Sequence, residues 1–232
     1  MSRERPARLL AGAFAVALAV DLGSLLAGSH TGHMAAKPLL MPLLAGYAAV
    51  RGAPRPLLAA LLFGWGGDVF LLSDADWAFL VGMGSFAAGH VCYLVLFARS
   101  RRTGTGRASV LLGALYGLAL VVLVASLWPG LPADLRVPVA GYSLLLTAMA
   151  WRSGGLGPVA GAGGALFLLS DTLIATGVAH WPQLPAPDFW IMLTYTAGQY
   201  LLAVGVLRTS SAEGPSPSVL PGVPSPAGRP RT

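Results

Sequence analysis

Four ionisable side chains lie within long apolar stretches of this 232-residue chain: Asp21, Asp68, His90 and Asp171. A charged group at the centre of a membrane helix costs roughly 2.5–3.5 kcal/mol on insertion scales, so such residues indicate function. Asp68 and Asp171 are the most informative, because they lie at similar depths in two separate stretches. Asp21 has no matching partner, and we expect it to be structural.

Two carboxyl groups in a site of low dielectric constant do not both ionise readily, which leaves a proton donor beside a proton acceptor. Such a pair suits acid-catalysed hydrolysis through an oxocarbenium ion, as in glycosidases. It also suits amide hydrolysis by an aspartyl dyad. The structural alternative is that each aspartate only hydrogen-bonds a neighbouring helix. The residue types therefore favour a hydrolase with Asp68 and Asp171 as its catalytic residues.

Other polar side chains share these apolar stretches and are expected to bind substrate. They are Lys37, His90, Tyr93, Tyr195 and Gln199. Lys37 is placed to hold a phosphate, and His90 and Gln199 to orient the aspartates. The alternatives are that Lys37 only extends its charge to the membrane surface and that His90 is a structural hydrogen-bonding group.

The composition excludes a soluble globule. Hydrophobic residues make up 55% of the chain and charged residues 10%, against roughly 25% charged in an ordinary soluble domain. The formal net charge is +6, but the basic residues are dispersed singly and form no stripe, so we expect no nucleic-acid partner. The single cysteine, Cys92, excludes a disulfide framework. Nothing in the sequence indicates an oligomeric state.

Eight stretches approach the roughly 20 apolar residues that a membrane helix needs. We expect helices over residues 8–27, 36–50, 56–73, 77–98, 108–128, 136–153, 158–178 and 188–207. The second is short and begins at Lys37-Pro38, so we expect it to be tilted or broken, with Lys37 at its outer end. Ala, Leu and Gly dominate over β-branched residues, which argues against strands. The sequence therefore predicts an all-α, polytopic membrane bundle of about eight transmembrane helices.

Basic residues gather in alternate connections between these stretches. With the N-terminus inside, the inner segments hold Arg3, Arg5, Arg8, Arg51, Arg55, Arg99, Arg101, Arg102, Arg107, Arg152, Arg208, Arg229 and Arg231. The outer loops hold only Lys37 and Arg136 as basic residues. This positive-inside pattern predicts that both termini are cytoplasmic. A cleaved signal peptide is disfavoured, because the first stretch is long and contains Asp21.

The chain divides into a transmembrane domain, residues 1–208, and a Ser/Pro-rich tail, residues 209–232, which we expect to be disordered and cytoplasmic. Richness in Ala, Gly, Arg and Pro is typical of a high-GC genome, and we expect the bacterial cytoplasmic (inner) membrane. Gly67-Asp68 resembles Ser170-Asp171, and Gly89-His90 resembles Gly198-Gln199. Their similar offsets are compatible with two parallel four-helix repeats.

At these residues the sequence resembles the YhhN-like membrane proteins, which include the lysoplasmalogenases. The resemblance rests on an ordered set of motifs: Lys37-Pro38, Gly67-Asp68, His90, Ser170-Asp171 and Gln199. It spans about residues 10–207, although the first, fifth and sixth stretches match only by hydrophobicity. It implies an enzyme that cleaves the vinyl ether bond of lysoplasmalogen, giving a fatty aldehyde and glycerophosphoethanolamine or glycerophosphocholine.

The resemblance further implies that Asp68 and Asp171 are the catalytic pair and that no metal or organic cofactor is needed. A lysophospholipid substrate and membrane lipid are the partners it implies. Two other functions remain open from the residues. A proton-coupled transporter also uses intramembrane carboxylates, but needs a path open alternately to both faces. An intramembrane aspartyl protease is weaker, because Trp65 replaces the first glycine of the usual Gly-x-Gly-Asp motif.

Overall fold

The computed structural model describes residues 4–99 and 106–212, and this part of the chain is helical, with no strand. Its eight α-helices are α1 (Glu4–Leu26), α2 (His30–Val50), α3 (Arg55–Phe70), α4 (Asp76–Arg99), α5 (Arg107–Leu127), α6 (Arg136–Ser153), α7 (Pro158–Val178) and α8 (Pro187–Ala212). A short 3-10 helix, Gly154–Leu156, joins α6 to α7. The predicted all-α bundle is confirmed.

Helix α2 differs from its prediction, because it is neither short nor broken at Pro38. It begins at His30, where the Ser29 hydroxyl accepts a hydrogen bond from the Gly32 amide. Pro42 has no N–H, so the Pro38 carbonyl lacks its helical donor. The Trp65 indole N–H of α3 donates to that carbonyl at 2.9 Å. This bond from a neighbouring helix compensates for the proline and joins α2 to α3.

The earlier start of α2 also corrects the place of Lys37. The side chain was expected at the outer end of its helix, near the level of lipid headgroups. In the structure Lys37 lies inside the helix and is 8% exposed. The sequence misled because Lys37-Pro38 looks like a helix start, whereas the turn before it is supplied by residues 30–36.

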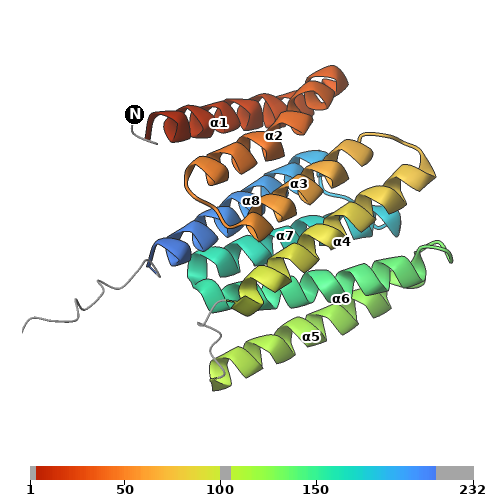
Figure 1. The fold of residues 1–232 in the computed structure, drawn as a ribbon. Coiled ribbons are helices and arrows are strands. Elements are labelled where there is room, and N and C mark those ends of the chain that lie inside the picture. The colour runs from red at the N-terminus through yellow and green to blue at the C-terminus, as the bar shows by residue number, and fades with distance from the viewer. Residues whose placement is uncertain (1–3, 100–105, 213–232) are drawn as a thin grey trace, which may run out of the picture.

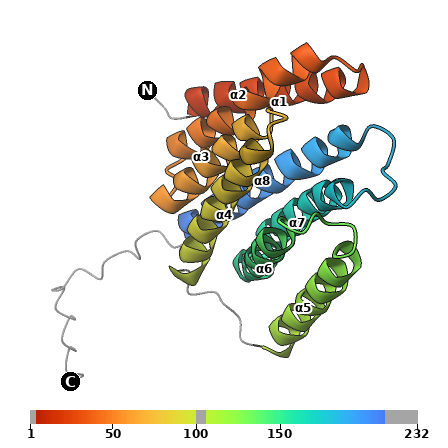
Figure 2. The ribbon, with the colours of Figure 1, turned by 90° about the vertical axis from the view of Figure 1, so that its right-hand side faces the viewer.

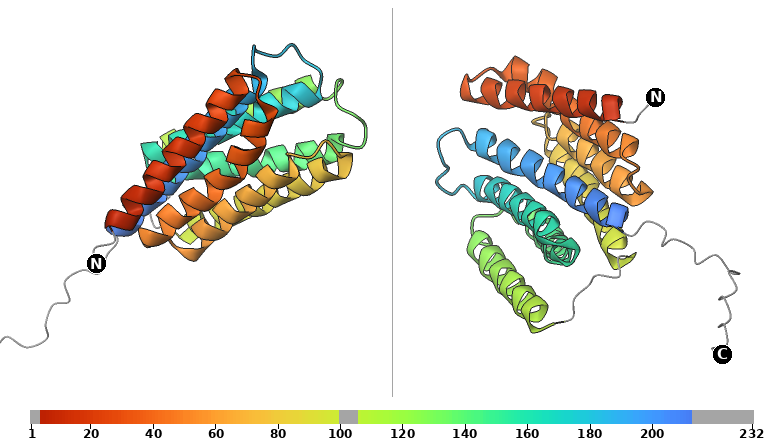
Figure 3. Two further views of the ribbon diagram at one scale, coloured as in Figure 1. Left: turned by 90° about the horizontal axis from the view of Figure 1, so that it is seen from above. Right: turned by 90° about the vertical axis from the view of Figure 1, so that its left-hand side faces the viewer.

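Seven of the helices in the described part form a closed ring, and α5 lies outside it. Consecutive neighbours around the ring are α1, α2, α3, α4, α6, α7 and α8, and α8 contacts α1 again. Figure 1 shows α1 at one edge and α5 at the other, while Figure 2 shows α3 and α4 across from α7 and α8. Helix α1 runs beside α8 (Figure 3). Among the described helices, α5 makes its main contact with α6.

The start of α1 and the end of α8 lie at the same end of the ring (Figure 1). Five helices of the described part are long and apolar enough to cross a membrane: α1, α4, α5, α7 and α8. The chain is therefore a multi-pass membrane protein, and crossing by α2, α3 and α6 stays a prediction. The predicted tail began at residue 209, but α8 continues to Ala212, so residues 209–212 are helical. The rest of the predicted tail, residues 213–232, lies outside the described part. The four-helix repeat also stays a prediction.

Helices α7 and α8 approach closely enough that glycine is required between them. A Cβ added to Gly163 would lie 2.6 Å from the Leu202 amide nitrogen and 2.8 Å from the Gly198 carbonyl oxygen. Likewise, a Cβ added to Gly198 would lie 2.9 Å from the Gly163 carbonyl oxygen. Small residues allow such contact between membrane helices, where packing rather than water drives association. This contact fixes α8, which carries Tyr195 and Gln199, against α7, which carries Asp171.

We expect Gly163→Ala to lower the melting temperature of the detergent-purified protein, because α8 must move away to admit the methyl group. Overpacking of this kind costs typically about 1–3 kcal/mol. Gly12→Ala in α1 is the matched control, since an added Cβ there meets no protein atom within 4 Å. Alanine also favours a helix over glycine, so the control should melt at or above the wild-type temperature. Equal melting of the two variants would contradict this account.

Candidate active site

The first polar group of the bundle is a buried chain of hydrogen bonds that ends at Asp68. The Tyr195 hydroxyl of α8 donates to Asp68 Oδ2 of α3 at 2.8 Å. Gln199 Nε2 approaches the Tyr195 oxygen at 3.5 Å, and the Tyr93 hydroxyl of α4 donates to Gln199 Oε1 at 2.7 Å. All four side chains are at most 3% exposed. The structure thus brings together four of the predicted site residues from three helices.

Gly64 makes room for this chain. It lies one helical turn before Asp68, so both residues face the same way. A Cβ at Gly64 would lie 2.8 Å from Gln199 Nε2 and 3.1 Å from the Tyr195 hydroxyl. A side chain here would therefore push away the partners of Asp68. The glycine serves the network inside the protein and does not line an open crevice.

The second polar group is centred on Asp171 and contains a residue that sequence reasoning missed. The Tyr142 hydroxyl of α6 donates to Asp171 Oδ2 of α7. His90 Nε2 of α4 lies 3.1 Å from the same Tyr142 oxygen. His90 is 1% exposed, and its Nδ1 has no hydrogen-bond partner among the described residues. The sequence did contain a signal for Tyr142, a tyrosine near the middle of an apolar stretch. It was missed because residues 136–153 match the family only by hydrophobicity.

An aromatic cluster separates the two polar groups. Phe167 packs edge-on against His90, with centroids 4.9 Å apart, and against Tyr195 at 5.3 Å. Phe86 packs against Tyr195 at 5.7 Å and against Phe167 at 6.1 Å. No hydrogen bond joins Asp68 to Asp171 in the described part of the chain, although Asp171 is one of the charged groups near Asp68. Each aspartate is therefore held by its own tyrosine.

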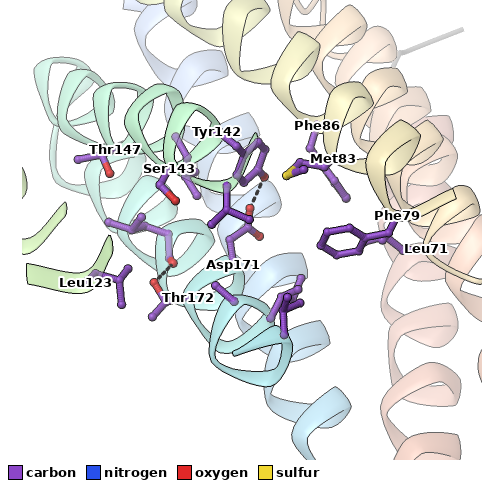
Figure 4. Close-up of a pocket in the computed structure, with 16 residues that line it drawn as sticks. Leu71, Phe79, Met83, Phe86, Leu123, Tyr142, Ser143, Thr147, Asp171 and Thr172 are labelled. Atoms are coloured by element: carbon purple, nitrogen blue, oxygen red, sulfur yellow. Dashed lines mark hydrogen bonds between the residues drawn. The ribbon is translucent and has the colours of Figure 1, made fainter. Parts of the chain in front are cut away.

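Asp171 lines a largely apolar pocket (Figure 4), whereas Asp68 is not among the residues that line it. The pocket lies between α4, α6 and α7, with Leu71 and Leu123 also lining it, and its cavity volume is about 60 Å³. Its polar side chains are Tyr142, Ser143, Thr147, Asp171 and Thr172. The pocket lies towards the end of the ring where α3, α5 and α7 finish, opposite the start of α1. A single carboxyl group in apolar surroundings is well placed to act as an acid.

A third polar group lies between α1 and α2. Asp21 is fully buried, and its Oδ1 lies 2.8 Å from His33 Nδ1. Its Oδ2 has no hydrogen-bond partner among the described residues. Lys37 lies near both Asp21 and Asp68. Asp21 therefore takes part in a charged cluster that sequence reasoning missed, because His33 falls before the predicted start of its helix.

Known proteins resemble this chain over most of its length. Residues 32–206 match the YhhN family. The human lysoplasmalogenase TMEM86B is 36% identical over 152 residues, which cover 62% of this chain and 59% of the human protein. A lysoplasmalogenase of Mycobacterium tuberculosis is 30% identical over 201 residues, covering 82% of this chain and 76% of the relative. The chain thus spans little more than half the length of the mammalian relative. No solved structure matches.

We expect His33→Ala to destabilise the protein, because the substitution removes the hydrogen-bond donor of the buried Asp21 carboxylate. Leaving a buried acceptor without a donor costs about 1–3 kcal/mol. The measurement is thermal unfolding in detergent. His30→Ala is the matched control, since His30 begins the same helix but is exposed. An equal loss of stability in both variants would refute a structural role for the Asp21–His33 pair.

Proposed function

Since the chain belongs to the YhhN family, we propose that it is a membrane hydrolase that cleaves the vinyl ether bond of lysoplasmalogen. Two of its relatives carry the name lysoplasmalogenase, one mammalian and one mycobacterial. The substrate would be a lysophospholipid drawn from the surrounding membrane, and the products a fatty aldehyde and glycerophosphoethanolamine or glycerophosphocholine. We further propose that the protein lies in the bacterial cytoplasmic membrane with both termini cytoplasmic.

The observation that carries this proposal is the Asp171 carboxyl group in an otherwise largely apolar pocket. Vinyl ether hydrolysis begins when a proton adds to the outer carbon of the double bond. That step needs a proton donor, held where a hydrocarbon chain can approach it. Oδ2 of Asp171 already accepts a hydrogen bond from the Tyr142 hydroxyl. We therefore assign proton delivery to the other oxygen, Oδ1. The apolar lining suits the chain that bears the reacting carbon.

The remaining steps regenerate the acid. Protonation leaves an oxocarbenium ion beside the Asp171 carboxylate, whose negative charge stabilises the cation. Water then adds to the carbon next to the ether oxygen and loses a proton to Asp171. The resulting hemiacetal collapses to the aldehyde and the glycerol hydroxyl. Every atom is accounted for by substrate and one water molecule.

Asp68 has a different part in the proposal. It is buried outside the lining of the pocket and accepts a hydrogen bond from Tyr195. We propose that its charge favours the cationic intermediate across the aromatic cluster, and that the nearby Lys37 limits that charge. His90, Tyr93, Tyr195 and Gln199 then hold the two carboxyl groups in place. Binding of the substrate phosphate by Lys37 stays a prediction.

We expect Asp171→Asn to lower the rate of aldehyde release at least about a hundredfold, the usual contribution of a general acid. An asparagine preserves shape but has no acidic proton to give. Asp68→Asn should also lose activity, through its charge. The measurement is aldehyde formation from vinyl-ether lysoplasmalogen in nanodiscs, read by a coupled dehydrogenase. Asp74→Asn, in the exposed loop after α3, is the control and should keep wild-type activity.

The same assay separates the alternatives. Full activity in a folded Asp171→Asn protein would refute the assigned acid. A well-folded wild type that releases no aldehyde would remove the lysoplasmalogenase proposal, and proton flux in liposomes would then test the transporter.

The hydrogen bond from Tyr142 to Asp171 gives a second prediction. We expect Tyr142→Phe to lower kcat by about ten- to a hundredfold, because a bond to a charged group is worth roughly 1.5–3 kcal/mol and 1.36 kcal/mol is tenfold in rate. KM should change less, since the ring remains. Tyr116→Phe in α5, outside the ring of helices, is the matched control. An unchanged kcat in Tyr142→Phe would show that the tyrosine does not assist Asp171.

A further inference from the structure

A second hollow lies between α4 and α6, beside the Asp171 pocket. From α4 it is lined by Leu80, Met83, Gly84 and Ala87. From α6 it is lined by Pro138, Gly141, Tyr142 and Leu145. Both sets have the spacing i, i+3, i+4 and i+7, which defines one face of a helix. The two faces oppose each other along the contact between α4 and α6, and together we call them the α4–α6 groove.

Two glycines keep the α4–α6 groove open. Gly84 and Gly141 are exposed, and a Cβ added to either would meet no protein atom within 4 Å. Gly64 and Gly163 are the contrast, because side chains or backbone of the neighbouring helix fill the space beside them. The protein therefore leaves open space between α4 and α6, whereas neighbouring groups fill the space beside Gly64 and Gly163.

The groove adjoins the pocket. Met83 and Tyr142 line both hollows, and Figure 4 shows them on facing sides of the pocket beside Asp171. Tyr142 is also the residue whose hydroxyl donates to Asp171. An elongated molecule in the groove would therefore pass between Met83 and Tyr142 and reach the reacting carboxyl group.

We propose that the α4–α6 groove holds the 1-alkenyl hydrocarbon chain of the substrate while its vinyl ether lies at Asp171. This inference rests on the proposed function. The groove lining is apolar apart from the Tyr142 hydroxyl, and the exposed surface of a membrane bundle faces hydrocarbon rather than water. A chain can thus enter sideways from the bilayer without being exposed to water, and the reacting carbons at its head come to rest beside the acid.

Filling the groove tests the inference without altering the acid or its tyrosine. Gly84→Leu and Gly141→Leu each place a side chain where the structure has open space. For a hexadecenyl lysoplasmalogen we expect kcat/KM to fall about tenfold, the effect of withdrawing roughly two methylene groups from an apolar site. For a propenyl analogue, whose chain ends one carbon beyond the double bond and so does not extend along the groove, we expect little change. Gly12→Leu is the control, because Gly12 is also an exposed helix glycine with open space beside it.

The outcomes separate this inference from the proposed function. A wild type that hydrolyses neither substrate overturns both. Wild-type hydrolysis, with the long and short chains affected equally in both leucine variants, overturns the assignment of the groove and leaves the hydrolase intact.

A second measurement needs no substitution. A lysoplasmalogen with a diazirine at the end of its alkenyl chain is irradiated with the wild-type protein in nanodiscs, and the labelled peptides are identified. We expect adducts on Leu80, Ala87 or Leu145 of the groove. Adducts confined to other helices would overturn the inference, even if the leucine variants failed to fold.

Discussion

The structure depends on one constraint: a polar group inside an apolar bundle must find its partner within the protein, because lipid supplies none. Two hydrogen bonds from tyrosine to aspartate meet this need and also decide which helices lie together. Tyr195 joins α8 to Asp68 of α3, and Tyr142 joins α6 to Asp171 of α7. The same rule explains α2, whose unpaired Pro38 carbonyl is satisfied by the Trp65 indole of α3. Polar pairing thus links neighbouring helices of the ring, as in α2–α3 and α6–α7, and also links α3 to α8 across it.

The two aspartates have similar positions along their helices but different surroundings. Asp68 is enclosed, 2% exposed, with Tyr195 against it and the chain through Gln199 to Tyr93 behind. Asp171 faces a pocket and has one tyrosine donor. Because the aromatic cluster lies between them, a substrate in the pocket would touch Asp171, and in the proposed mechanism Asp68 acts only through its charge. The structure therefore gives different surroundings to two aspartates that look equivalent in the sequence.

Much of the architecture follows from apolar stretch length, because each stretch must satisfy its backbone internally and can only be a helix. The start of α2 was missed because the segment His30–Ala36 contains two histidines and a threonine, whose polarity hides a helical turn. The candidate residues Asp68, Tyr195, Gln199 and Tyr93 were identifiable as polar groups in apolar stretches. Tyr142 was not, since a tyrosine is ordinary in a membrane helix until its partner is known. Spacing along one helix cannot show which side chain of another helix it meets.

Glycine shows the same limit at the level of packing. Gly64 and Gly163 admit neighbouring groups of the protein, whereas Gly84 and Gly141 admit none. In sequence all four are small residues in apolar helices. Only the arrangement of the helices separates the two uses: a glycine opposite a close neighbour brings helices together, and a glycine at an open seam leaves space for another molecule. Because the open seam adjoins the pocket at Tyr142, the same feature that leaves space between α4 and α6 would give a hydrocarbon chain access to Asp171, the proposed acid.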